Sequence, residues 1–253
     1  LPARDVFVRE IAGGAATFTG DGSPLNKLAG LGFAGLPDER ELGEIEVEFA
    51  RRGSPVQAEV STLGEPALFP LLAGRGYVLQ GFENVSGIAL PAASSAGAAP
   101  GVEIATSGAE ELPLWLDVVV SGFETPDTQG VLSHESSPRE ALEGVMRDMV
   151  SARGFVRYRG NTPAGGASLR VGEGIALLCG AATLPAHRRH GVQSALLTRR
   201  LADAARQGCE VAVVTTQPGS KSQQNVQRQG FGLLYARAVL VRPVPGTRTR
   251  SGP

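Results

Sequence analysis

The chain has 253 residues, of which 42% are hydrophobic, and 24 basic side chains balance 25 acidic ones to a net charge of −1. This balance excludes the strongly basic surface of nucleic-acid-binding proteins, so we expect no nucleic-acid partner. No apolar run reaches the roughly 20 residues of a membrane-spanning helix, so we expect no membrane partner either, and the length allows one large domain or two of ordinary size.

The first 90 residues predict a small domain of alternating strands and helices. Short apolar or alternating runs between glycines indicate strands. The helix expected after Pro37 begins with Asp38, Glu39 and Glu41, whose charges suit the positive end of a helix dipole. The expected elements are a hairpin (5–9 with 15–19), a strand at 26–33, a helix at 37–53, a strand at 56–60, a short helix at 66–73 and a strand at 77–90.

The segment LPAASSAGAAPG, residues 90–101, holds almost only small residues and proline, without charge or periodicity. Such a composition is typical of a linker. We therefore predict one domain over 1–90, a linker over 91–101, a second domain over 102–243 and a flexible tail over 244–253.

The second part predicts a longer series of strands and helices. Segment 123–138 has no clear period and separates two expected helices. The expected elements are a strand at 102–105, helices at 109–122 and 139–152, a hairpin (155–159 with 166–171), a strand at 175–184, a helix from 192 to Gly208, a strand at 210–216, a helix at 220–229 and a strand at 233–241.

The two parts repeat one order: strand, helix, strand, short helix, a glycine before an aromatic residue, and strand. Gly76 and Gly230, the glycines before the aromatic residues, are 154 residues apart, and so are Val56 and Glu210, which begin the middle strands. Similarity at a domain-sized period predicts a duplication. The first copy is shorter at its front.

A basic loop connects the strand at 175–184 with the helix that follows. The loop reads AHRRH and is closed by Gly191, after which the helical pattern begins at once. A helix N-terminus presents free backbone N–H groups and the positive end of its dipole, and a glycine lets a ligand oxygen approach the backbone. The pattern predicts a phosphate or pyrophosphate site, although neither a Walker loop nor G-x-G-x-x-G is present.

This loop resembles the acyl-CoA loop of the GCN5-related N-acetyltransferases (GNAT), whose pattern is Q/R-x-x-G-x-G/A. Arg188 fills the first position and Gly191 the fourth, whereas Gln193 stands where glycine or alanine is usual. The order of elements after the loop is also similar, and the resemblance covers 102–243. It implies an α/β architecture with a mixed sheet, the GNAT fold, in two GNAT-like halves of which the first is degenerate.

The resemblance implies acetyl-CoA as the donor substrate. Residues just before Pro185 would offer backbone groups to the pantetheine and thioester, and the loop with the first helical turn would hold the pyrophosphate. The helix at 220–229 would line the same cleft. The implied donor-binding residues are Ala182, Thr183, Leu184, Arg188, Arg189, His190, Gly191, Val192, Gln193, Ser194 and Asn225.

The catalytic acid and base carry weaker signals. The tyrosine that the family often has five residues before the phenylalanine is Val226 here, so Tyr235 is the nearest phenol to protonate the leaving thiolate. The central strand has no glutamate, so Glu124 is a candidate base by position. Other candidates by position are Asp127, His134 and Glu135. His187 and His190 lack a carboxylate or cysteine partner in sequence, so we expect no metal site.

Cys179 and Cys209 lie at the edges of apolar strand segments and lack metal-ligand spacing. We therefore predict two reduced, buried thiols and a cytoplasmic protein. Because Cys179 lies on an expected buried strand, an acyl-cysteine route is disfavoured.

Together these features predict an enzyme, an N-acetyltransferase that moves the acetyl group of acetyl-CoA to a primary amine of an unidentified acceptor by direct attack. Two alternatives stay open: a non-catalytic acyl-CoA-binding regulatory module, and a structural duplicate that binds nothing. The acidic start of the 37–53 helix predicts that the first half binds no CoA. The oligomeric state is open, with a homodimer among the options.

Overall fold

The computed structural model describes residues 5–91, 102–125, 138–148, 152–158, 162–244 and 246. The chain forms two compact units: unit 1 comprises Leu1–Glu83 with Tyr235–Pro253, and unit 2 comprises Asn84–Leu234. The predicted linker after residue 91 and most of the predicted tail lie outside the described residues.

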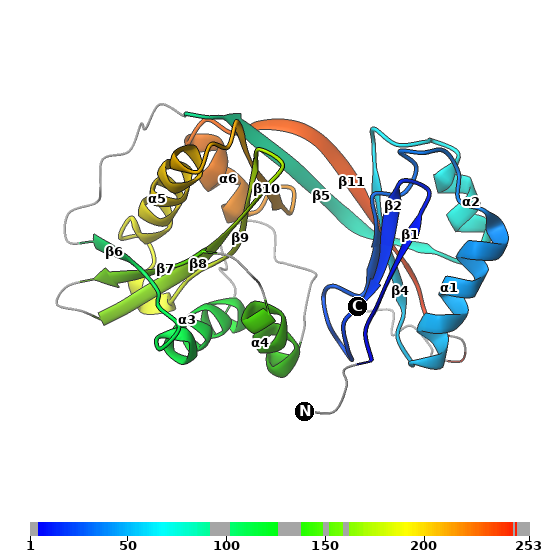
Figure 1. Ribbon diagram of the computed structural model, residues 1–253, viewed down its shortest axis with the longest axis horizontal. Helices are drawn as coiled ribbons and strands as arrows, with labels where there is room; N and C mark the ends of the chain where they lie inside the picture. Colours follow the sequence, from blue (N-terminus) through cyan, green and yellow to red (C-terminus); the bar gives the residue numbers. More distant parts are fainter. Residues whose placement is uncertain are drawn as a thin grey trace. The chain divides into compact units, whose positions relative to one another are not determined.

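Unit 1 is a twisted sheet that packs against two helices (Figure 1). Its strands pair in the order β1-β2-β3-β4-β11, and all pairs are antiparallel except β3 with β4. The helices α1 and α2 cover a core that includes Leu28, Phe49 and Val60. The bounds are β1 Phe7–Ile11, β2 Gly14–Phe18, β3 Lys27–Ala29, α1 Glu39–Arg51, β4 Val56–Ser61, α2 Leu68–Gly74 and β11 Gly232–Arg242.

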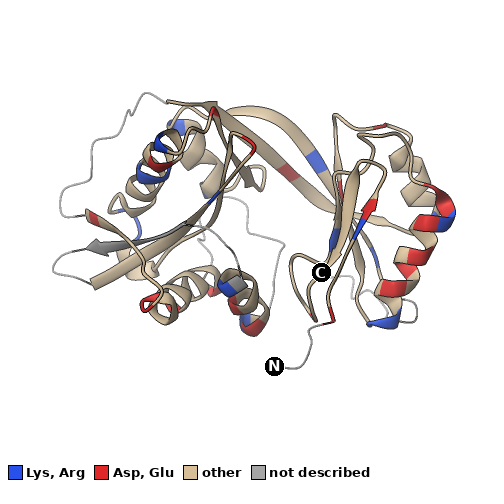
Figure 2. Cartoon of the chain, viewed as in Figure 1, with Lys and Arg blue, Asp and Glu red and all other residues tan. Residues whose placement is uncertain are grey.

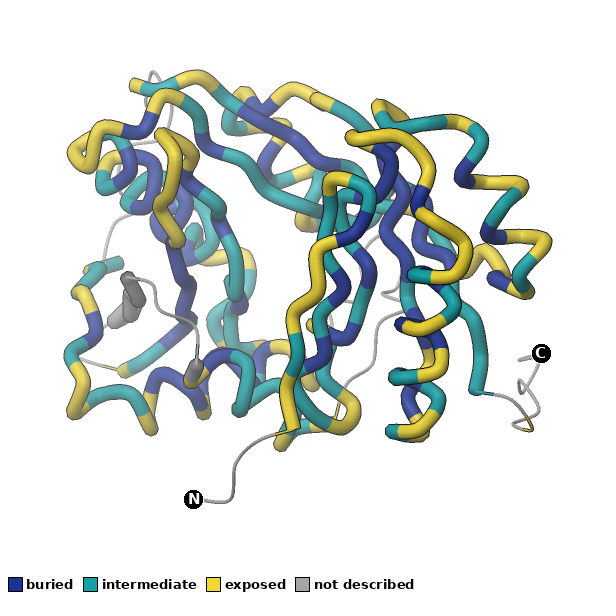
Figure 3. The backbone as a smooth tube through the Cα atoms, turned by 45° about the vertical axis from the view of Figure 1, so that its right-hand side comes forward, coloured by how far each residue is buried: buried dark blue, intermediate teal, exposed yellow. Residues whose placement is uncertain are grey.

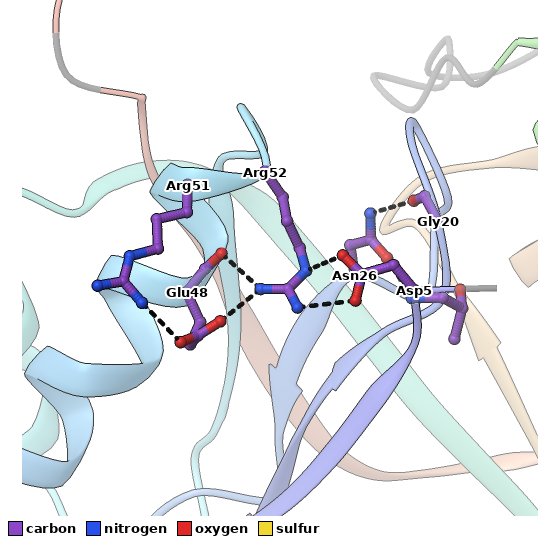
Figure 4. Close-up of polar contacts among 7 residues, drawn as sticks. Asp5, Gly20, Asn26, Glu48, Arg51 and Arg52 are labelled. Atoms are coloured by element: carbon purple, nitrogen blue, oxygen red, sulfur yellow. Dashed lines mark hydrogen bonds and ion pairs between the residues drawn. The ribbon is translucent and has the colours of Figure 1, made fainter. Parts of the chain in front are cut away.

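Helix α1 forms because Leu42, Ile45 and Phe49 recur at helical spacing, and all three side chains are fully buried. Arg52, the C-cap residue of α1, links this helix to Asp5, which precedes β1 (Figure 4). Its guanidinium donates to the Asp5 carboxylate at 2.7 and 2.8 Å and to Oε2 of Glu48 at 2.5 Å. The end of α1 is thus held by two carboxylates that lie far apart in the sequence.

Unit 2 is a mixed sheet with the strand order β5-β10-β9-β8-β7-β6. The β9–β10 pair is parallel, and the other neighbours are antiparallel. The bounds are β5 Val78–Ala89, β6 Val102–Thr106, β7 Ala152–Tyr158, β8 Thr162–Gly172, β9 Ile175–Thr183 and β10 Val211–Thr216. In Figure 3 the buried stretches of the chain follow the strands, and β8 is buried continuously from Ala164 to Leu169.

Helices pack on both faces of the sheet of unit 2. Helices α3 (Leu112–Glu124) and α4 (Arg139–Asp148) form one core with Ala182 of β9. Helices α5 (Val192–Arg206) and α6 (Lys221–Arg228) pack on the other face, against Ala176 and Leu178 of β9 and Ala212 of β10. The middle strands are covered on both sides, which explains their nearly continuous apolar sequence.

The two long strands β5 and β11 each pass from one unit into the other (Figure 1). Residues 84–89 of β5 pair with β10 in unit 2, and residues 237–242 of β11 pair with β4 in unit 1. Most of β11, the last strand of the second half of the sequence, therefore lies in unit 1. Residues 84–89 of β5, the last strand of the first half, lie in unit 2. The compact units consequently divide at 83/84 and 234/235. The sequence predicted a division at 91–101. The two differ because the residue pattern of a strand does not specify the strand with which it pairs.

Elements of the first half of the sequence recur in the second half at the offset predicted from sequence. Helix α1 corresponds to α5, β4 to β10, α2 to α6 and β5 to β11, and each pair is shifted by about 154 residues. Glu83 of β5 and Arg237 of β11, which are joined by a hydrogen bond, have the same separation of 154 residues. Among the described residues of unit 1, nothing corresponds to α3 or α4. The strand expected at 26–33 is only Lys27–Ala29, since Gly30 and Gly32 adopt positive φ and end it.

Candidate functional site

Strands β9 and β10 begin side by side and then separate. Their parallel register joins Ile175–Leu177 to Val211–Val213, although β9 continues to Thr183 and β10 to Thr216. Beyond Leu177, the backbone of β9 has no β10 partner in the described register, so its polar groups on that side are available to a ligand. The hydroxyls of Thr183 and Thr216, at the two strand ends, are buried without a hydrogen-bond partner among the described residues.

A β-bulge lies in β9 just before its end. Ser168 pairs with Cys179 and Gly166 pairs with Ala182, so two residues of β9 face the single residue Ala167. Gly180, in the bulge, adopts φ +54°, and a Cβ there would lie 2.6 Å from Oγ of Ser168. Bulges bend a strand and increase its twist. The bulge therefore turns Ala182, Thr183 and the following loop away from the regular ladder.

The loop after β9 brings the chain into α5 through two residues with positive φ. Arg189 has φ +65° and Gly191, the N-cap, has φ +79°. The first backbone bond of the helix joins N of Ala195 to O of Gly191 at 2.9 Å, and no side chain caps the helix. The N–H groups of the three preceding residues are therefore oriented along the helix axis and free to bind an anion. These residues are Val192, Gln193 and Ser194.

The corresponding helix of unit 1 begins differently. Oδ1 of Asp38 accepts hydrogen bonds from N of Arg40 at 2.9 Å and N of Glu41 at 3.0 Å. Two further glutamates lie in its first turn, whereas the first turn of α5 contains no acidic residue. Figure 2 shows the same contrast along the helices, with acidic residues frequent on α1 and basic ones on α5. The anion-binding potential of this position is therefore confined to unit 2.

Arg188 contacts the protein backbone. Its Nε donates to O of Thr183 at 3.3 Å, and Nη2 donates to O of Thr125, which follows α3. The side chain thus ties the loop to the end of β9 and to the end of α3. Arg189 and His190 are exposed, and Gly191 is half-buried. A contact of Arg188 with a phosphate stays a prediction.

Glu124 ends α3 and belongs to an ion-pair cluster around Arg139. The Arg139 guanidinium lies 2.6 Å from Oε2 of Glu124, 2.8 Å from Oδ1 of Asp117 and 2.8 Å from Oε1 of Glu143. Desolvation lowers the pKa of Arg139, but its hydrogen bonds to Asp117 and Glu124 outweigh this and raise the pKa above its usual value. Glu124 is therefore paired with a persistent cation, and its role as a base stays a prediction.

The predicted acid and helix residues lie apart from the loop in the sequence. Tyr235 is a half-buried residue of β11 and belongs to unit 1, whereas the loop belongs to unit 2. Asn225 is half-buried on α6, where its Oδ1 accepts a hydrogen bond from Arg228 at 3.3 Å. Val226 is only 2% exposed and lies in the core of unit 2. The position where the family often has a tyrosine is therefore part of the apolar core.

Asp127, His134 and Glu135, the other candidate bases, lie outside the described residues. In the described part of the chain, no group of three or more His, Cys, Asp or Glu side chains is arranged to hold a metal ion. None of the helices described is both long and apolar enough to cross a membrane. Neither cysteine forms a disulfide among the described residues. Cys209 is buried, and Cys179 is half-buried.

The sequence profile of the acetyltransferase (GNAT) family matches residues 123–231, a segment that contains β9, the loop and the start of α5. Residues 123–231 form a GNAT domain. The GNAT family transfers acyl groups, so this membership supports an acyltransferase activity in general. No curated protein sequence matches the chain.

Solved structures share the fold over nearly the whole chain. A GCN5-related N-acetyltransferase from Kribbella flavida has a TM-score of 0.70 at 17% identity, over 96% of this chain and 90% of the other. A functionally unknown conserved protein from Staphylococcus epidermidis has a TM-score of 0.69 at 10% identity, over 96% of both. A tandem GNAT protein from the clavulanic acid biosynthesis pathway has a TM-score of 0.58 at 15% identity, over 93% and 80%. The mixed α/β fold of the chain is thus that of the acyl-CoA N-acyltransferases.

Sequence reasoning missed two features beside the loop of the GNAT domain. One is the bulge at Gly180, for which a glycine inside a strand pattern was the available signal. The other is Arg200, which lies on α5 with only 7% of its surface exposed. A charged residue within the apolar stripe of a helix was the signal that could have drawn attention to it.

Proposed function

We propose that the chain is an N-acetyltransferase that moves the acetyl group of acetyl-CoA to a primary amine. Two neighbouring features carry this proposal: the start of α5 has no side-chain cap, and β9, the strand before it, has separated from β10. The free N–H groups and the dipole of α5 suit a pyrophosphate, and the unpaired backbone of β9 suits the amides of a pantetheine arm. One ligand that carries both groups is an acyl-CoA.

The proposal assigns the donor-binding residues to parts of the acetyl-CoA molecule. Backbone groups of Ala182, Thr183 and Leu184 bind the pantetheine and orient the thioester. Backbone N–H groups at the start of α5 bind the pyrophosphate, and the exposed Arg189 adds positive charge. Asn225 contacts the donor from α6. The remaining members of the proposed donor site are Arg188, His190, Gly191, Val192, Gln193 and Ser194.

The chemistry is direct attack. The neutral amine nitrogen attacks the thioester carbon, the C–S bond breaks, and the CoA thiolate leaves. The amine loses one proton, through water, to Glu124, and the thiolate gains one from Tyr235. An acyl-cysteine route is disfavoured, because burial raises the pKa of the Cys179 thiol, against smaller lowering effects of Ser168 and Arg200.

The first half is proposed to be a degenerate copy that binds no CoA. Its helix α1 is capped by Asp38, and its strand β3 has three residues where β9 has nine. The N–H groups that would bind a pyrophosphate are therefore already engaged.

The competing proposal is a non-catalytic acyl-CoA-binding module. Two observations favour it: Val226 is buried where the family often has a tyrosine, and Glu124 is paired with Arg139. Incubation of the protein with acetyl-CoA and a panel of primary amines, with detection of free CoA thiol, separates the two. Amine-dependent thiol release supports the transferase, binding without release supports the module, and absence of both contradicts a donor site.

A further inference from the structure

Arg200 is a buried cation without a carboxylate partner. It lies on α5 and is 7% exposed, and none of its ion-pair or hydrogen-bond partners among the described residues is a carboxylate. Burial lowers the pKa of Arg200 to about 10. Burying an arginine in this way is costly, so the contacts that it makes must offset the loss of hydration.

Among the described residues, the hydrogen bonds of the Arg200 guanidinium all go to backbone carbonyls. Nη1 donates to O of Ser168 at 3.2 Å and to O of Cys179 at 3.4 Å, while Nε donates to O of Leu196 on its own helix at 3.3 Å. Cys179 and Ser168 are the pair that begins the bulge. Arg200 therefore holds the point at which β9 departs from the regular ladder.

This contact connects the two ends of the proposed donor site. Arg200 is eight residues after Val192, about 12 Å along the helix whose start would hold the pyrophosphate. On the other side, Cys179 is three residues before Ala182, where the thioester-binding segment begins. One side chain thus joins the helix that would bind the phosphates to the strand that would bind the acyl arm.

The matching position of unit 1 has a different environment. Glu46 of α1 corresponds to Arg200, and it is paired with Arg75 at 2.8 Å and Arg242 at 2.9 Å. The strand that corresponds to β9 is the three-residue β3, whose described pairings with β2 and β4 contain no bulge. The buried guanidinium and the bulge therefore occur together, in the unit that has the uncapped helix.

We propose that Arg200 is a positioning residue for the acyl donor: by holding the carbonyls of Ser168 and Cys179, it fixes the bulged end of β9 relative to the start of α5. This inference rests on the proposed donor function. Arg200 does not touch the donor in this account. It sets the spacing between the phosphate-binding and the thioester-binding groups.

The test compares two ligands that use different parts of the site. ADP 3′-phosphate carries the pyrophosphate without the pantetheine, and acetyl-CoA carries both. In the full chain with Arg200→Met, we expect the Kd of acetyl-CoA to rise about tenfold, which corresponds to the loss of one or two hydrogen bonds to the pantetheine arm. The Kd of ADP 3′-phosphate should change less than about twofold. Arg200→Lys, which keeps the charge and a donor, should restore part of the acetyl-CoA affinity.

Arg199→Met is the matched control. Arg199 lies on the same helix and also donates to a backbone carbonyl, O of Ile104 at 3.2 Å, but this carbonyl belongs to β6. The control should leave both affinities unchanged. If Arg200→Met fails to fold, the same comparison with Arg200→Lys and with Gly180→Ala, which disturbs the bulge directly, should show selective loss of acetyl-CoA.

The outcomes separate the two proposals. If the parent protein binds neither ligand, the proposed donor function fails, and the role of Arg200 as a donor-positioning residue fails with it. If the parent binds both ligands and folded Arg200 variants bind both as the parent does, the donor function stands and the positioning role is overturned. Equal loss of both ligands in a folded variant also overturns it, because the effect would then lie in α5 as a whole.

Discussion

Glu46 and Arg200 occupy matching positions on α1 and α5, and both side chains are buried, at 3% and 7% exposure. Their charges are opposite, and so are their surroundings. Glu46 is neutralised by two arginines, whereas the partners of Arg200 in the described part of the chain are backbone carbonyls. The same helix position therefore carries a buried ion pair in unit 1 and, in unit 2, an arginine that contacts the bulged strand β9.

Replacement of Glu46 should destabilise unit 1. Glu46→Gln would leave Arg75 and Arg242 without their buried carboxylate, and breaking such a pair typically costs about 3–5 kcal/mol. We expect a loss of about 3 kcal/mol in the free energy of unfolding, measured by urea denaturation. The control is Glu44→Gln, because Glu44 is 52% exposed and pairs with Arg40 on the surface of the same helix. An equal effect of both variants would contradict a buried, structurally important pair.

A negative charge at the start of α5 should weaken donor binding. Ser194 lies in the first turn, where a carboxylate would accept hydrogen bonds from the free N–H groups and repel a pyrophosphate. Ser194→Glu should raise the Kd of acetyl-CoA about tenfold and leave helix stability unchanged or slightly higher. Ser194→Gln has the same shape without the charge and should have a much smaller effect. Equal losses in the two variants would show that size, and not charge, matters there.

The stability of unit 1 should fall in acid because of Arg52. Its hydrogen bonds lower the pKa values of Asp5 and Glu48 from their ordinary 3.8 and 4.5. A carboxyl group with a lowered folded-state pKa stabilises the protein above its unfolded pKa, and this contribution is lost as the pH falls through the folded value. We therefore expect the free energy of unfolding to decrease between about pH 5 and pH 3.

Arg52→Met should flatten this decrease. The variant also loses the contact of the guanidinium with the Phe7 ring, at 5.2 Å, but that loss does not depend on pH. Arg51→Met is the control, since Arg51 is 71% exposed and pairs with Glu48 one turn earlier on the same helix. Unfolding curves at several pH values would contradict the account if Arg52→Met kept the full slope.

Cys179 should be dispensable for turnover. Burial raises the pKa of its thiol, so at neutral pH the nucleophilic thiolate is rarer than in an ordinary cysteine. Cys179→Ala should keep thiol release within about twofold of the parent, and iodoacetamide should modify Cys179 more slowly than a free cysteine. A trapped acetyl-cysteine in the parent protein, or loss of turnover in the variant, would contradict direct attack.

The local chemistry of the donor site was predictable from the sequence. The apolar run, the basic loop, Gly191 and the following helical pattern are adjacent in the chain, so their arrangement depends on local propensities. The capped start of α1 was predictable for the same reason, because Asp38 precedes its own helix. The structure contains the strand, Gly191 as the N-cap of α5, the Asp38 cap of α1 and the offset between the two halves. Donor binding at the start of α5 stays a prediction.

The long-range features were not predictable. The second half of β5 pairs with β10 and β11 pairs with β4, and nothing in either strand's sequence distinguishes these partners from the ones within its own half. The contact of Arg200 with Cys179 depends on how α5 lies on the sheet, which periodicity does not fix. The burial of Val226 is likewise a result of packing.

The start of α5 as the donor site is the central claim, and isothermal titration of acetyl-CoA into the parent protein and into Gly191→Trp tests it most directly. Gly191 has φ +79°, and a tryptophan there would cover the free N–H groups. The control is Gly35→Trp, at a positive-φ glycine in the corresponding loop of unit 1, where a Cβ has open space. We predict that the parent and Gly35→Trp bind acetyl-CoA and that Gly191→Trp, folded as judged by circular dichroism, does not. Absence of binding to the parent, or unchanged binding to Gly191→Trp, would contradict the account.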